Sequence, residues 1–106
     1  MSKQESLDDV RLDIQAVNFD LTDGLRDRIL QSLGKLRRYY SGDVITAEVY
    51  MRLEESHGPN DKSYRVKYGV PGNDVFAEDT GDNWGALISS VAAKLNRQLE
   101  KQFARS

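Results

Sequence analysis

The sequence has no cysteine and only one histidine, His57, among its 106 residues. The absence of cysteine excludes disulfide bonds, cysteine-ligated zinc and a thiol nucleophile, and one histidine leaves little material for a histidine-rich metal site. No apolar run approaches the roughly 20 residues that span a bilayer. The first nine residues, MSKQESLDD, lack the apolar stretch of a signal peptide. We therefore expect a cytoplasmic protein without a membrane partner.

The composition is otherwise that of an ordinary globular domain. Hydrophobic residues make up 39% of the chain and charged residues 30%, which favours a folded protein over a disordered one. The length suits one domain, and the sequence shows no internal repeat and no linker. We expect a flexible tail over residues 1–8 and a single domain over residues 9–106.

The net charge of −2 conceals an uneven distribution of charge along the chain. Residues 1–27 carry three basic and seven acidic side chains, whereas residues 91–106 carry four basic side chains and one acid. Such asymmetry can mark a polyanion-binding face on a protein whose overall charge does not suggest one. Two solvated helix faces would leave the same pattern, so charge alone does not decide between them.

Hydrophobic periodicity predicts four strands and two helices. Alternating apolar residues place strands over residues 10–19, 45–53, 64–70 and 74–79. The last two strands form a hairpin, because VPGN at residues 70–73 fits a type II turn. Thr22 is a good N-cap for a first helix that reaches about residue 40, and a second helix is predicted over residues 82–104. Each helix has one apolar stripe, so this α+β chain should place both on one face of a four-stranded sheet, in the order β-α-β-β-β-α.

Both predicted helices carry basic residues. Those of the second helix flank its apolar stripe; on the first helix, three cluster on the outward side (Arg28, Lys35 and Arg38) and two border the stripe (Arg26 and Arg37). On the second helix the row falls within roughly 80° around the axis, so it should form a charged edge beside the sheet. If the helices lie side by side, their two rows can merge into one surface for phosphates. The residues are Arg26, Arg28, Lys35, Arg37 and Arg38 on the first helix and Lys94, Arg97, Lys101 and Arg105 on the second.

Two segments resemble a known family. NFDLTDGLRDRILQSLGKLRRYY and VPGNDVFAEDTGDNWGALISSVAAKLNRQLEKQ are similar to the first helix and to the final hairpin and helix of the ribosome hibernation-promoting factor / ribosome-associated inhibitor A family, also called the sigma-54 modulation proteins. The resemblance covers about residues 10 to 103. It implies the β-α-β-β-β-α fold of that family, which is similar to a double-stranded-RNA-binding domain.

The resemblance also implies a function. Proteins of this family bind the small ribosomal subunit in the channel for messenger RNA and transfer RNA, and they block translation in stationary phase or stress. Basic side chains of the two helices contact ribosomal RNA. The chain looks like the short form, which acts together with a separate ribosome modulation factor. The positions matching basic family positions are Arg26, Lys35, Arg38, Lys94, Arg97 and Lys101.

Some features favour an alternative, a family member that acts as a protein-interaction regulatory module without ribosome binding. The loop EESHGPND is longer and more acidic than the basic loop of the family, and Glu100 and Phe103 stand where several relatives have lysine. On this hypothesis the fold is inherited and much of the RNA surface is lost.

An enzyme is the least favoured hypothesis, because no nucleophile and base converge in the sequence. We expect no catalytic residue, cofactor, metal or small-molecule substrate. His57 is interpreted as a surface residue, and Trp84 as a cover for the core. The acids Glu78, Asp79 and Asp82 are interpreted as solvated side chains, although their spacing also suits a metal.

Overall fold

A computed structural model describes residues 11–36, 46–54, 61–69 and 74–103 of the chain. The elements are β1 (Arg11–Val17), α1 (Asp23–Lys35), β2 (Thr46–Leu53), β3 (Lys62–Gly69), β4 (Val75–Gly81) and α2 (Trp84–Phe103). This order confirms the predicted α+β class and the β-α-β-β-β-α arrangement. The predicted tail, the type II turn and the end of the first helix beyond Leu36 lie outside the described residues, as does His57.

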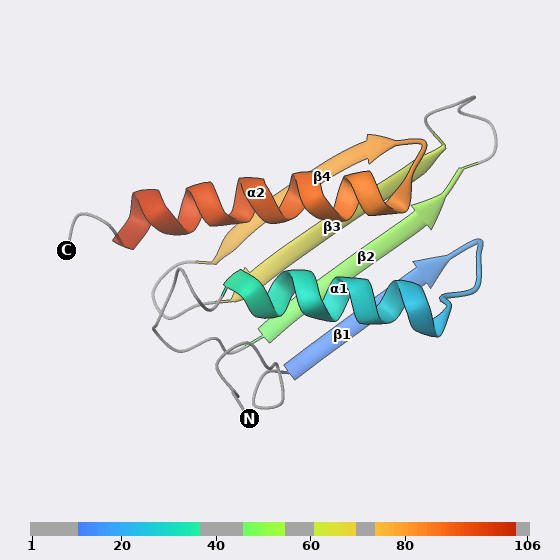
Figure 1. Cartoon of the computed structure of the whole chain (residues 1–106), viewed down its shortest axis with the longest axis horizontal. Helices are drawn as coiled ribbons and strands as arrows, with labels where there is room; N and C mark the ends of the chain where they lie inside the picture. The colour runs from blue at the N-terminus through green and yellow to red at the C-terminus, as the bar shows by residue number, and fades with distance from the viewer. Residues whose placement is uncertain (1–10, 37–45, 55–60, 70–73, 104–106) are drawn as a thin grey trace.

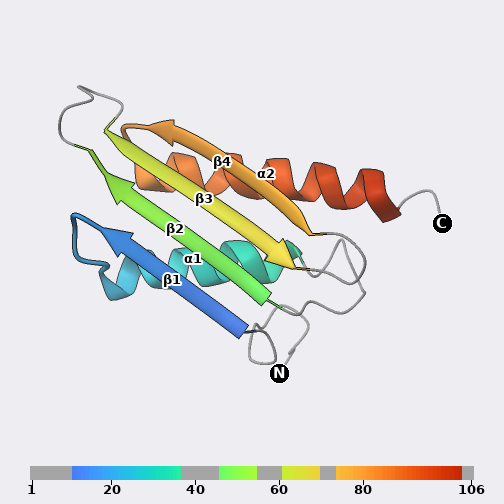
Figure 2. The ribbon, with the colours of Figure 1, turned by 180° about the vertical axis from the view of Figure 1, so that it is seen from behind.

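The four strands form one mixed sheet in the order β1-β2-β3-β4. β1 runs parallel to β2, whereas β2 with β3 and β3 with β4 are antiparallel. Figure 1 shows α1 and α2 side by side on one face of the sheet, and Figure 2 shows the opposite face without a helix. The sheet therefore has one covered face and one open face, as the single apolar stripe on each helix predicts.

Side-chain caps fix where both helices begin. The hydroxyl of Thr22 accepts a hydrogen bond from the backbone N–H of Leu25 at 3.2 Å, as predicted. Asn83 caps α2 in the same way, because its side-chain oxygen accepts from the N–H of Ala86 at 3.0 Å. The helix consequently begins at Trp84, two residues later than the sequence pattern suggested.

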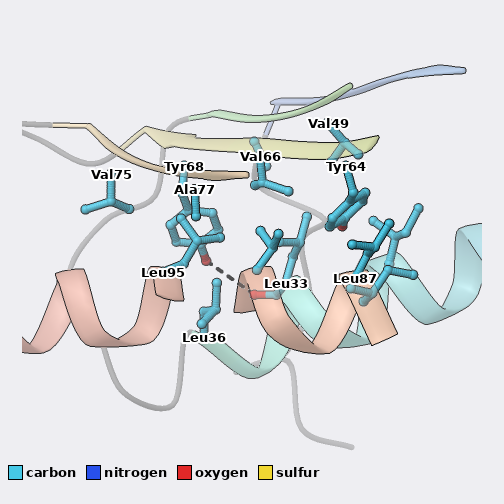
Figure 3. Close-up of a cluster of buried hydrophobic side chains, with 14 of the residues drawn as sticks. Leu33, Leu36, Val49, Tyr64, Val66, Tyr68, Val75, Ala77, Leu87 and Leu95 are labelled. Atoms are coloured by element: carbon cyan, nitrogen blue, oxygen red, sulfur yellow. Dashed lines mark hydrogen bonds between the residues drawn. The ribbon is translucent and has the colours of Figure 1, made fainter. Parts of the chain in front are cut away.

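The core lies between the sheet and the two helices (Figure 3). Alternate residues of β2, β3 and β4 meet the apolar stripes of the helices, and Tyr64 and Tyr68 are among the largest fully buried side chains. The hydroxyl of Tyr68 donates to the carbonyl of Leu33 at 3.4 Å, which joins β3 to α1. Trp84 packs against this core and stacks on Phe19 with ring centroids 4.9 Å apart, which confirms its predicted role.

The described helices are amphipathic and lie on the sheet. None of them, over the residues that the structure describes, is both long and apolar enough to cross a membrane.

Candidate nucleic-acid interface

A groove of about 440 Å³ lies between α1 and α2. The α1 side supplies cations and hydrogen-bonding groups, whereas the α2 side is mostly small residues, which let a ligand approach the helix closely. The lining residues on α1 are Arg28, Gln31, Ser32, Lys35 and Leu36, and those on α2 are Gly85, Ile88, Ser89, Ala92, Ala93 and Asn96. The side-chain oxygen of Asn96 is buried and has no hydrogen-bond partner in the described part of the chain.

Arg28 and Lys35 are the two cations of this interhelical groove. They are seven residues apart on α1, which separates their backbone positions by about 10 Å along the helix axis. Both are exposed, and neither forms an ion pair with an acid among the described residues. Two positive charges are therefore available to an external anion in this groove.

Arg26, the other predicted basic residue in the described part of α1, is not among the residues that line the interhelical groove. Arg26 is exposed but lies about 200° around the helix from Arg28, so it faces a different direction. Arg37 and Arg38 lie outside the described residues, as does Arg105 beyond α2.

The basic row of α2 lines a second groove, of about 340 Å³, beside β4. Lys94, Arg97 and Lys101 lie there with Phe76 and Glu78 of the strand. This arrangement confirms the predicted charged edge beside the sheet. The two helices do lie side by side, but their described basic residues occupy opposite flanks of α2. Among the described residues the basic side chains therefore line two separate grooves, and one merged basic surface stays a prediction.

Lys94 is engaged in holding α2 against β4. Its ammonium group donates to the carbonyl of Glu78 at 3.1 Å and lies 3.6 Å from the carboxylate of Asp79. That carboxylate also accepts from the hydroxyl of Ser90 at 2.7 Å and from the backbone N–H of Thr80 at 2.9 Å. The bonds from Ser90 and Thr80, with a smaller effect of Lys94, hold the pKa of Asp79 below its ordinary value. The charge of Lys94 is thus balanced within the fold.

Gln98 is a further interacting residue, and its role was not predicted from the sequence. Its side-chain oxygen accepts from the backbone N–H of Phe76 at 3.1 Å, and its amide nitrogen donates to the backbone carbonyl of the same residue. The side chain therefore occupies both hydrogen-bonding groups of one residue on an edge strand. No sequence pattern signals this contact, because a glutamine on a helix flank is ordinarily solvated.

Two of the three acids considered as metal ligands, Glu78 and Asp79, have other partners. Glu78 forms an ion pair with Arg65 at 3.1 Å across the β3–β4 ladder, and Asp79 is bound as described above. The described residues contain no group of three or more histidines, cysteines or acids that could hold a metal ion. Arg65 also lies 5.0 Å from the ring centroid of Phe76, so the charges on this part of the open face are balanced locally.

The fold and the basic helices define a small, single-domain α+β protein with exposed cations on its helix layer. Residues 12–106 match the family described as sigma 54 modulation protein / S30EA ribosomal protein, and the chain belongs to that family. The family groups ribosome-associated factors rather than enzymes, which agrees with the expectation of a non-enzymatic protein.

Two curated relatives are ribosome hibernation promotion factors. The protein of Lactococcus lactis is 29% identical over 99 residues, which cover 91% of this chain and 51% of the relative. The protein of Staphylococcus aureus is 29% identical over 98 residues, which cover 91% of this chain and 50% of the relative. The chain therefore spans about half the length of these relatives.

Two solved structures share the fold. The N-terminal domain of Thermus thermophilus Protein Y superposes with a TM-score of 0.73 at 24% identity, covering 89% of this chain and 98% of that one. A ribosomal subunit interface protein from Coxiella burnetii superposes with a TM-score of 0.71 at 17% identity, covering 90% of this chain and 97% of that one. At these identities the likeness establishes the fold.

Proposed function

We propose that this protein is a cytoplasmic ribosome hibernation factor. It binds the small ribosomal subunit at the channel for messenger RNA and transfer RNA and blocks translation in stationary phase or stress. Membership of the family and the similarity to two hibernation promotion factors support the assignment. The observation that carries the proposed surface is a pair of cations in the interhelical groove, Arg28 and Lys35, that have no ion-pair partner within the described part of the chain.

The chemistry of this groove suits an RNA backbone. Each phosphate that a lysine or arginine contacts releases condensed counterions, which makes binding favourable at low salt. The planar guanidinium of Arg28 can donate two hydrogen bonds to one phosphate, and the ammonium of Lys35 supplies a second charge farther along the groove. Ser32 and Gln31 on the same wall add neutral hydrogen-bonding groups.

The flank of α2 beside β4 forms a second, weaker surface in this proposal. Arg97 and Lys101 are exposed there and have no ion-pair partner among the described residues. Lys94 contributes less than its position in the sequence suggests, because releasing it for RNA would break its contacts with Glu78 and Asp79. The RNA-binding role of all nine predicted basic residues stays a prediction.

A protein-interaction regulatory module remains the alternative function. The open face of the sheet favours it. Phe76 is 42% exposed there, which offers apolar surface to a protein, and the charge of the neighbouring Arg65 is already paired with Glu78 and so is less available to RNA. On this alternative the partner is a protein and the ribosome is not bound, whereas a separate ribosome modulation factor belongs to the ribosome-binding function proposed above. Such a partner would bind the sheet and not the helices.

Co-sedimentation of the purified protein with small ribosomal subunits, at low and at physiological salt, tests the proposed function. Wild-type protein should pellet with subunits and dissociate as salt rises, and Arg28→Glu/Lys35→Glu should stay in the supernatant. Arg11→Glu/Lys67→Glu is the matched control, because it makes the same change in net charge on the open face of the sheet. Equal loss in both variants, or no wild-type binding at either salt, would contradict the proposal.

A further inference from the structure

The guanidinium of Arg28 fills the space beside Gly85 on the neighbouring helix. A Cβ atom at residue 85 would lie 2.8 Å from Nη2 of Arg28, 3.1 Å from Nη1 and 3.2 Å from Cζ. Carbon and nitrogen atoms that are not bonded meet at about 3.5 Å or more. A side chain at residue 85 and the present position of Arg28 are therefore incompatible.

If residue 85 carried a side chain, the side chain of Arg28 would move and the backbone would not. All three close atoms belong to the end of a long, exposed side chain, so Arg28 can turn away without moving either helix. Gly85 is the second residue of α2, where no left-handed backbone conformation requires glycine. Glycine within a helix costs about 0.5–1 kcal/mol relative to alanine. The close approach of Arg28 is the structural feature that alanine would not permit.

The position of the Arg28 guanidinium beside Gly85 suits the binding of an anion. It places the guanidinium against the first turn of α2, where the helix dipole adds a partial positive charge, and within the groove that also contains Lys35. Turning Arg28 away would leave its charge on the protein but move its hydrogen-bonding fork out of the groove. Long-range attraction would survive, and the directed phosphate contact would be lost.

We infer that Gly85 is a positioning residue, which sets Arg28 for contact with the RNA backbone by leaving room for its guanidinium on α2. This inference rests on the proposed function of the groove. It concerns how one cation is placed, and it predicts that a change at a residue without a side chain weakens RNA binding while the fold is retained.

The chain provides a closely matched control for this test. Gly24 is the second residue of α1, as Gly85 is of α2, and a Cβ atom at Gly24 would meet nothing within 4 Å. Gly85→Ala and Gly24→Ala should both keep or slightly raise the melting temperature, because alanine favours the helix. Only Gly85→Ala should weaken binding to small ribosomal subunits, by about three- to tenfold, the range for a partly lost charge-assisted contact. Gly24→Ala should bind as the wild type does.

A double-variant cycle separates positioning from a merely structural effect. In an Arg28→Ala background, Gly85→Ala should cause no further loss of affinity, because the side chain that it displaces is gone. Wild-type affinity in Gly85→Ala, or an equal loss in both backgrounds, would overturn the inference.

A direct readout covers the case in which even wild-type protein does not bind subunits, which would refute the proposed function. The NMR signal of the Arg28 Nε–H group should then shift in Gly85→Ala and stay in place in Gly24→Ala. An unmoved signal in Gly85→Ala would overturn the positioning role independently of any ribosome.

Discussion

The side-chain amide of Gln98 on α2 faces the backbone of Phe76 on β4 and satisfies both its N–H and its carbonyl group. In an edge strand such groups otherwise form a template for another strand. Lys94 satisfies the carbonyl of Glu78 two residues farther along, and Asp79 accepts from the N–H of Thr80. Side chains thus close much of the outer edge of β4, and the helix flank that appears in sequence as a basic row also protects the sheet.

Gln98→Ala should therefore increase self-association. The substitution frees two backbone groups of Phe76 for pairing with the β4 edge of a second copy. Sedimentation velocity at increasing protein concentration would measure the effect, with Gln31→Ala on α1 as the control for loss of a surface glutamine. If Gln98→Ala self-associates no more than Gln31→Ala does, the amide of Gln98 does not prevent pairing at the edge of β4.

Two buried tyrosines of β3 should respond in opposite directions to loss of the hydroxyl. The Tyr64 hydroxyl is buried without a hydrogen-bond partner among the described residues, and burial raises the pKa of Tyr64 above its ordinary value. Tyr64→Phe removes that unsatisfied group and should raise the free energy of unfolding by about 1 kcal/mol. Tyr68→Phe loses the bond to Leu33 and should lower it by about 1 kcal/mol. Urea unfolding measures both; destabilisation by Tyr64→Phe would contradict the account of its environment.

Stability should fall in acid partly through Asp79. Its pKa in the folded protein is held below the ordinary value of 3.8 for aspartate. Its contribution to stability is therefore complete above that value and is lost as the pH falls through the lower, folded-state pKa. Asp79→Asn should make the decrease of unfolding free energy below about pH 4 shallower. Ser90→Ala removes the hydrogen bond that lowers the pKa of Asp79 most. It should also make the acid decrease of unfolding free energy shallower, but by less than Asp79→Asn does. Unfolding curves between neutral and acid pH that fall equally in all three proteins would contradict this assignment.

The fold could be predicted from the sequence because its signals are local. The alternating residues of β2 and the apolar stripe of α2 each identify the buried face of one element. Thr22 is a favoured N-cap and predicts where α1 begins. The start of α2 was misplaced although a signal was present, since asparagine is a favoured cap and Asn83 precedes the helix.

The site could be predicted only in part, because its decisive contacts join distant residues. Periodicity placed Lys94 on a basic flank, but its partners lie on β4 and are known only once α2 is packed. Likewise, the role of Gly85 depends on an arginine that lies 57 residues earlier in the chain, and no local pattern connects them. A sequence pattern identifies the cations, whereas the packing of the elements determines which of them are free.

The most direct test of the central claim compares the two basic surfaces on the same ribosomal particle. Affinity for small subunits would be measured across a salt series for wild type, Arg28→Ala/Lys35→Ala and Arg97→Ala/Lys101→Ala. The account predicts that the groove variant loses more affinity, and that the slope of log affinity against log salt falls by roughly 0.7–0.9 for each lost phosphate contact. If the groove variant retains the affinity and slope of the wild type, the interhelical groove is not the RNA-binding surface.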